Sequence, residues 1–261
     1  MQKESNVFSF RASDGNNVKF EYRHSLPSAA ALAKTYAKAG YPDRYAVFTE
    51  NQTALSSIGT PLSSGESEKG IFLSCILRPS IFPSQAGVIG PLSALACALA
   101  LEEHTTKKMD IGWVSDIYCE GVKIGGITLE GKLDSHTSYE YLIINFAIRI
   151  DDKNFPTRLT DMVRQVFEED NVSVPMIMAK TVLNKFFSIY TELKNPTKQL
   201  NLYVNKFALT DKKITYVKDG KKKIAKVIGV NKDDLKMIIE TRDGRKISVS
   251  SPSSVIIPNK I

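Results

Sequence analysis

The chain has 261 residues, of which 43% are hydrophobic and 24% are charged, and its formal net charge is +7. This length is enough for one large domain with its own core and a small second domain. The composition is ordinary for a soluble globular protein, and it excludes a membrane-spanning helix because the longest apolar run, 88–101, is too short and contains Pro91.

The cysteines indicate a reducing compartment. The sequence has an odd number of cysteines, which lie in apolar segments without C-x-x-C spacing: Cys75, Cys97 and Cys119. This pattern argues against a disulfide framework and against a zinc site. The first residues lack the apolar core of a signal peptide, and the three histidines are scattered without metal-ligand spacing. We therefore expect a cytoplasmic protein with no metal site and no membrane segment.

The positive charge is concentrated near the C-terminus. Residues 206–261 contain 14 Lys/Arg and 6 Asp/Glu, whereas the rest of the chain is close to neutral. A basic domain can bind nucleic acid or an acidic protein surface. The favoured interpretation is a solvated lysine-rich surface, because no helix-turn-helix pattern and no aromatic–basic interleaving accompanies the charge. We do not expect nucleic-acid binding.

The first half of the chain alternates strand and helix patterns. Ser25 or Ser28 can cap a helix over 29–39 that ends at Gly40. The Ser-, Gly-, Thr- and Pro-rich stretch 52–70 predicts a long loop, and such loops are usually functional or disordered. The other predicted elements are strands over 45–49 and 71–77 and a buried helix over 85–103.

The second half ends in short strands. The dipeptide Glu120-Gly121 predicts a hairpin between strands over 116–119 and 125–130. Further predictions are a strand over 141–150, an amphipathic helix over 159–167, a helix from Pro175 to about Leu193, and strands over 224–230, 237–241 and 246–250. Asp219-Gly220 and Asp243-Gly244 are strong turn dipeptides between the last strands. They predict a small β-barrel attached to the larger domain.

The most informative stretch is 113–130. Trp113 and Asp116 precede a tight turn, and Lys123 is followed by the adjacent glycines Gly125 and Gly126 in a strand. Paired glycines inside an apolar strand usually mark close approach of the backbone to another group, here taken as a ligand. Core or surface roles remain open for each of these side chains.

These residues resemble the signature of the biotin–protein ligase family, K-W-P-N-D followed by K-x-G-G-I-x-x-E. Other segments agree with the family in the same order: the stretch around Ser25, the A-x-x-Q-T-like 50–53, the L-S-x-x-L-R-P-like 72–79, the helix after it and the terminal barrel. The resemblance thus covers nearly the whole chain.

The resemblance implies an α+β fold, with a mixed sheet like that of class II aminoacyl-tRNA synthetases flanked by helices and a small C-terminal SH3-like β-barrel. It implies a catalytic-type domain over 1–200, a barrel over 206–261 and no N-terminal winged helix. Biotin, ATP and Mg²⁺ would be the cofactors, and the biotin-carrier domain of a carboxylase would be the partner; a homodimer stays open.

The resemblance also carries a set of candidate site residues. Lys123 is the candidate catalytic residue. The candidate ligand-binding residues are Ser25, Gln52, Thr53, Trp113, Asp116, Gly125, Gly126 and Ile127.

The chain departs from the family where cations are required. A gapless reading places 55–60, which contains no arginine, at the G-R-G-R-x-G loop, and Gly112 at the lysine of K-W-P-N-D. Loss of one preorganised donor to a developing anion costs roughly 100- to 1000-fold in rate. We therefore expect a biotin–protein ligase-like protein with a degenerate site. The alternatives are a non-catalytic relative that binds a small ligand or carrier protein, and a lipoyl- or octanoyl-transfer protein.

Overall fold

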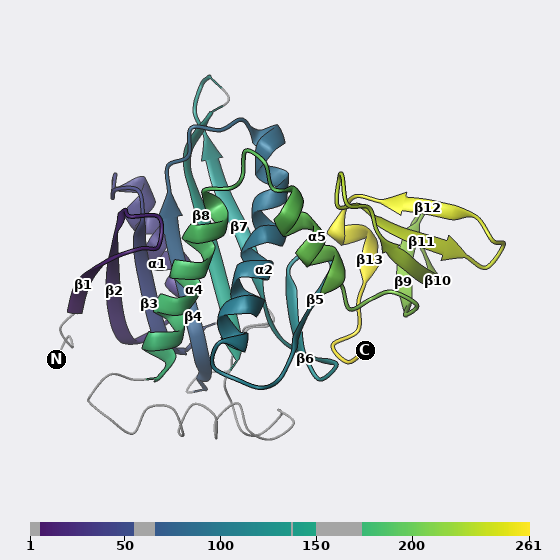
Figure 1. The fold of residues 1–261 in the computed structure, drawn as a ribbon, viewed down its shortest axis with the longest axis horizontal. Helices are drawn as coiled ribbons and strands as arrows, with labels where there is room; N and C mark the ends of the chain where they lie inside the picture. Colours follow the sequence, from purple (N-terminus) through teal and green to yellow (C-terminus); the bar gives the residue numbers. More distant parts are fainter. Residues whose placement is uncertain (1–5, 55–65, 137, 150–173) are drawn as a thin grey trace.

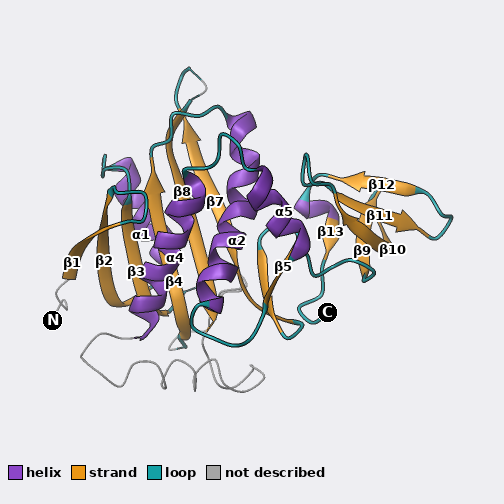
Figure 2. Ribbon diagram, viewed as in Figure 1, coloured by secondary structure: helices purple, strands orange, loops and turns teal. Residues whose placement is uncertain are grey.

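The computed structural model describes residues 6–54, 66–136, 138–149 and 174–261. Two β-sheets of unequal size organise these residues (Figures 1 and 2). The large sheet contains eight strands in the order β1-β2-β3-β4-β8-β7-β6-β5. Its strands are β1 (Asn6–Arg11), β2 (Asn17–Leu26), β3 (Tyr45–Gln52), β4 (Glu68–Leu77), β5 (Met109–Gly112), β6 (Asp116–Cys119), β7 (Val122–Leu133) and β8 (Tyr139–Arg149). Only β2 and β3 pair in parallel; the other neighbours are antiparallel.

Helices cover both faces of the large sheet. One face packs against α2 (Ile89–Glu102) and α4 (Val174–Tyr190), which lie in front of it in Figure 1. The other face packs against α1 (Ala29–Lys38), whose buried alanines contact a separate apolar cluster. Strand β4 shows why both cores exist: Ile71 and Leu73 face the first cluster, whereas Phe72 and Ile76 face the second. Alternating side chains of one buried strand thus contribute to two cores.

The small sheet follows α5 (Thr197–Asn205) and has the order β12-β11-β10-β9-β13. Its strands are β9 (Lys213–Lys218), β10 (Lys221–Val230), β11 (Met237–Thr241), β12 (Lys246–Val249) and β13 (Val255–Ile256). The α+β class and the small terminal β-domain are confirmed. The predicted closed barrel is not seen: β13 has two residues and pairs with β9, and no pairing joins it to β12 in the part of the chain the structure describes.

Several element boundaries match the predictions and others move. The Ser28 hydroxyl accepts from the Ala31 amide and caps α1, as one of the two proposed caps. The predicted helix over 85–103 begins instead at Ile89, after a 3₁₀ segment, η1 (Pro83–Val88). Pro91 explains the shift, because proline has no backbone N–H and is tolerated in a first helical turn but not deeper.

Two predicted features lie outside the described residues. They are the helix over 159–167 and most of the loop that was expected over 52–70; the described parts show that β3 extends to Gln52 and that β4 begins at Glu68. Helix α5 is not among the predicted elements; it lies between the predicted helix that ends near Leu193 and the predicted strands of the small domain.

Candidate functional site

The two halves of the predicted signature meet across the β6–β7 hairpin. Asp116 is the first residue of β6 and pairs in register with Gly126 of β7. Its carboxylate oxygen Oδ1 forms an ion pair with Nζ of Lys123 at 2.8 Å. Both side chains are about one fifth exposed, with 24% for Asp116 and 19% for Lys123. Burial raises the pKa of Asp116 above its usual value, and the Lys123 ammonium offsets part of that rise. The site therefore contains a partly buried ion pair between a carboxylate and an ammonium group.

Neighbouring groups lie close to both of the adjacent glycines, and at Gly125 they leave no room for a side chain. A Cβ at Gly125 would lie 2.1 Å from the Ala147 carbonyl oxygen of β8. A Cβ at Gly126 would lie 3.1 Å from the Asp116 carboxylate and 3.4 Å from the Ser115 carbonyl. The first distance is far inside van der Waals contact, so only glycine fits there. The structure thus accounts for Gly125 by strand packing, and it places Gly126 against the acid of the candidate site.

Hydrogen bonds fix this corner of the sheet. The Ser115 hydroxyl donates to the Ile127 carbonyl at 2.7 Å, and the Ile127 amide donates to the Ser115 carbonyl at 3.0 Å. The Ile127 side chain is buried and belongs to the core between the sheet and α2. Ile127 therefore holds the hairpin in shape through its backbone.

Gly112 has no room for a side chain. A Cβ at this position would lie 2.6 Å from Cε2 of Tyr118 and 3.2 Å from Cβ of Asp116. The Tyr118 ring is fully buried and its hydroxyl donates to the Pro258 carbonyl at 2.8 Å. A lysine at position 112 would therefore have to displace an anchored aromatic ring.

Trp113 is a core residue that joins the two sheets. Its indole N–H donates to the Leu235 carbonyl at 2.9 Å, and its side chain is 4% exposed. The sequence left a pocket role and a core role open for Trp113. The contacts in the structure are those of a core residue at the boundary with the small sheet.

The remaining predicted ligand-binding residues lie at or just after the ends of β2 and β3, which β4 and β8 separate from β7 in the strand order of the large sheet. Gln52 is buried, and its side-chain oxygen accepts from the Ala29 amide at the start of α1 at 3.3 Å. Ser25 and Thr53 are exposed, and the Thr53 amide donates to the Leu26 carbonyl. The structure thus separates these three residues from the Asp116–Lys123 pair by the width of β4 and β8.

The strand register shows that both groups occupy one end of the sheet. Gln52 pairs with Glu68, Gly70 with Arg149, and Ile148 with Gly125. These paired residues form a row across β3, β4, β8 and β7. The row lies at the C-terminal ends of β3 and β8, which is the same end of the sheet as the N-terminal ends of β4 and β7. This row is the candidate ligand-binding floor.

Two residues of this floor, Arg149 and Glu68, and Asn145 farther along β8 were missed as site candidates. The Arg149 guanidinium forms a 2.6 Å ion pair with Glu68. Asn145 donates through Nδ2 to the Thr128 hydroxyl at 3.3 Å, while its buried Oδ1 has no hydrogen-bond partner. Arg149 and Glu68 lie far apart in the sequence and meet only through the pairing of β4 with β8, so local sequence carried no signal for this pair. Arg149 places a cation at this end of the sheet.

The described residues contain no group of three His, Cys, Asp or Glu side chains able to hold a metal ion. Their helices also include none with the length and apolarity that crossing a membrane requires. All three cysteines are buried and unpaired, and burial raises the pKa of Cys97 to about 12. A buried thiol with a raised pKa is a poor nucleophile.

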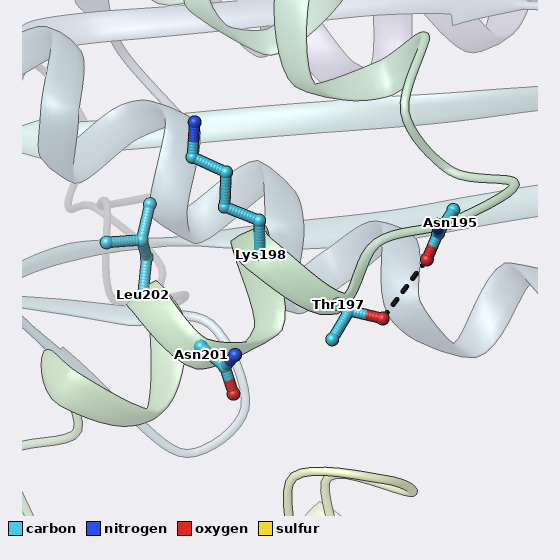
Figure 3. A pocket seen from close by; sticks show the side chains of 5 residues that line it. All are labelled: Asn195, Thr197, Lys198, Asn201 and Leu202. Carbon is cyan, nitrogen blue, oxygen red and sulfur yellow. Dashed lines mark hydrogen bonds between the residues drawn. The ribbon is translucent and has the colours of Figure 1, made fainter.

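A hollow of about 500 Å³ beside α5 is a weaker candidate (Figure 3). Thr197 donates to the Asn195 side chain at 3.1 Å, while Lys198 and Asn201 point to different sides of the helix. Ligand sites place a few polar groups so that they converge on one point. These polar groups diverge, so the hollow does not compete with the floor of the large sheet.

Comparison with solved structures decides the fold. The chain matches the ligand-free structure of biotin protein ligase from Aquifex aeolicus with a TM-score of 0.65 and 16% identity, over 91% of this chain and 97% of that one. The chain has the biotin protein ligase fold. The same Aquifex enzyme in complex with biotin and ATP matches with a TM-score of 0.64 and 15% identity, again over 91% and 97% of the two chains.

The sequence comparison agrees with this fold. The chain is 27% identical over 143 residues to the bifunctional ligase/repressor BirA of Bacillus subtilis, which covers 54% of this chain. The match spans 44% of the BirA length, so the chain aligns with less than half of this curated relative. No family model matches the chain. The resemblance to biotin–protein ligases predicted from the motifs is confirmed, and the chain is similar to these proteins in fold.

Proposed function

We propose that this protein binds biotin or a related small carboxylic acid on the floor between β3 and β7, with weak or absent ability to activate it. In the family that the sequence resembles, the biotin carboxylate attacks the α-phosphate of ATP and releases pyrophosphate. A lysine of a carrier domain then attacks the biotinyl-adenylate. The fold, and the biotin and ATP bound by the Aquifex enzyme, support the ligand class.

The observation that carries the proposal is the closed space beside Gly112. Position 112 is a glycine where the signature has a lysine, and the Tyr118 ring lies where a side chain at this position would begin. Lys123 is the cation of the signature that remains, and its ammonium lies 2.8 Å from the Asp116 carboxylate. Phosphoryl chemistry needs cations directed at the charge that develops in the transition state. An ion-paired lysine meets that need poorly.

The remaining functional groups would act by binding. Lys123 can exchange its Asp116 partner for a ligand carboxylate, and Arg149 can do the same with Glu68. Mg²⁺ would arrive with the nucleotide, since the described residues offer no three-ligand cluster of their own. A biotin-carrier domain is the partner that the family implies, and its binding to this chain is part of the proposal.

A second candidate function is a non-catalytic module that binds a carrier protein without a small ligand. The ion pairs favour it, because Lys123–Asp116 and Arg149–Glu68 satisfy the charged groups of the floor internally. A site that is already paired requires no ligand to balance its charge.

ATP–pyrophosphate exchange in the presence of biotin tests the proposal. The purified chain should exchange at least about 100-fold more slowly than a ligase with a complete signature, as expected for loss of one preorganised cation or more. Robust biotin-dependent exchange would overturn the degenerate-site proposal. Calorimetric titration with biotin, lipoate and ATP then separates the two functions. Binding of an acid without exchange supports the first, and binding of none supports the second.

A further inference from the structure

The small sheet carries a groove far from the candidate ligand floor. The groove measures about 430 Å³ and lies between the start of β10 and the turn from β11 to β12. It is lined by Tyr216, Lys222, Lys223, Ile224, Thr241, Arg242, Asp243 and Arg245. In Figure 1 these strands lie at the end of the molecule opposite β1. This surface plays no part in the proposed function.

The groove has an excess of unbalanced positive charge. Its one carboxylate, Asp243, accepts from the Arg245 Nε at 2.7 Å and from the Thr241 hydroxyl. These contacts, Arg245 first, lower the pKa of Asp243 to about 2, so the acid is ionised and already paired. Lys222, Lys223 and Arg242 form no ion pair with a carboxylate of the described residues. Three cations therefore face the groove without a counter-charge from this part of the chain.

The groove also borders an unpaired strand edge. Strand β10 pairs with β9 along 221–226, but its pairing with β11 begins only at Ala225 opposite Thr241. Residues 221–224 therefore have a strand on one side and no described strand on the other. A free strand edge offers backbone N–H and C=O groups to an extended peptide, which can add as a further strand.

The apolar lining distinguishes the class of partner. Ile224 is 46% exposed and offers a hydrophobic contact on this edge. The one aromatic ring of the lining, Tyr216, is 8% exposed, so it presents little ring face for stacking a base. Single-stranded nucleic acids gain much of their affinity from such stacking. The combination of cations, an exposed aliphatic side chain and a free strand edge suits a polypeptide.

We propose that this groove binds an extended acidic segment of a partner protein. The segment adds as a strand beside 221–224, places carboxylates against Lys222, Lys223 and Arg242, and packs an apolar side chain on Ile224. The charges provide orientation and fast association, and the backbone pairing provides register.

Fluorescence anisotropy on the full chain tests the proposal with three labelled probes. They are a peptide of alternating glutamate and valine, a peptide of alternating lysine and valine, and single-stranded oligothymidylate. The acidic peptide should bind, and its affinity should fall as salt is raised to about 0.15 M. Tighter binding of the oligothymidylate, or no binding of the acidic peptide, would overturn the proposal.

Charge-reversal variants locate the site. The triple variant Lys222→Glu, Lys223→Glu, Arg242→Glu should weaken acidic-peptide binding about tenfold or more. The matched control Lys212→Glu, Lys213→Glu, Lys232→Glu changes the net charge equally at exposed lysines outside the groove, and it should have a much smaller effect. Equal losses in both variants would show general electrostatic attraction and contradict the assignment. Unfolding midpoints of both variants confirm that each is folded.

Hydrogen exchange of the backbone amides distinguishes strand addition from binding by charge attraction alone. Bound peptide should slow exchange of the alternate amides within 221–224 that do not point towards β9, because strand addition satisfies these N–H groups. Binding that leaves these amides unprotected would contradict strand addition.

Discussion

At the scale of single residues, the glycines of the signature show how a pattern can be right and its cause different. The sequence correctly indicates that Gly125 and Gly126 lie at a close approach. It cannot tell which group approaches, because the register between β7 and β8 brings together residues about twenty positions apart. The Ala147 carbonyl is the neighbour that excludes a side chain at Gly125. A ligand is not needed to explain that glycine.

Gly112 gives a direct test of the packing that closes the site. The Gly112→Ala variant should lower the free energy of unfolding by about 1–3 kcal/mol, because its Cβ would overlap the anchored Tyr118 ring. Urea denaturation measures the loss. Gly87→Ala is the matched control, since a Cβ there meets nothing within 4 Å, and it should change stability by less than about 0.5 kcal/mol. A Gly112→Ala variant as stable as this control would show that the space beside Tyr118 is open.

At the scale of elements, the sequence was most reliable where local chemistry decides the structure. All three predicted turns occur: Glu120 and Gly121 have positive φ values, as do Asp219 and Gly220, and Gly244 has one in the turn between β11 and β12. Strand β11 has the bounds that were expected. Helix α5 was not predicted, and its cause is non-local, because it is a short helix that packs against α2.

The two hairpin glycines allow strain and packing to be separated. Gly121 and Gly220 have φ values of +77° and +69°, so alanine is strained at both, by about 1–2 kcal/mol. A Cβ at Gly220 meets nothing within 4 Å, whereas one at Gly121 would lie 2.7 Å from the Ile261 carbonyl oxygen. Gly121→Ala should therefore lose more stability than Gly220→Ala in chemical denaturation.

This difference reports how the C-terminal residues bind the candidate site. The Ile261 amide donates to the Gly121 carbonyl and the Lys123 amide donates to the Asn259 carbonyl. Equal losses in the two variants would mean that residues 259–261 move aside at no cost and do not brace the β6–β7 hairpin.

At the scale of the whole molecule, the small sheet is built into the candidate site. The Trp113 indole donates to Leu235, the Tyr203 hydroxyl donates to the Val114 carbonyl at 2.8 Å, and the Tyr118 hydroxyl donates to Pro258. Each bond joins the β5–β6 region to a segment more than 80 residues later in the chain. The core cluster also continues from the large sheet into the small one. The sequence predicted two units, and the structure joins them through the segment that carries the signature.

This joining predicts that the two sheets unfold together. Trp113 is the one tryptophan of the sequence and lies at their boundary, so its fluorescence reports separation of the sheets, while far-UV circular dichroism reports loss of the strands and helices. In urea both signals should give one coincident transition. Trp113→Phe removes the hydrogen bond to the Leu235 carbonyl, so it should lower the free energy of unfolding by about 1–3 kcal/mol and move the transition to lower urea. Circular dichroism measures this shift, because the variant has no tryptophan. A fluorescence transition that precedes the dichroism change would instead show that the small sheet detaches first, and the candidate site would then depend on a separable domain.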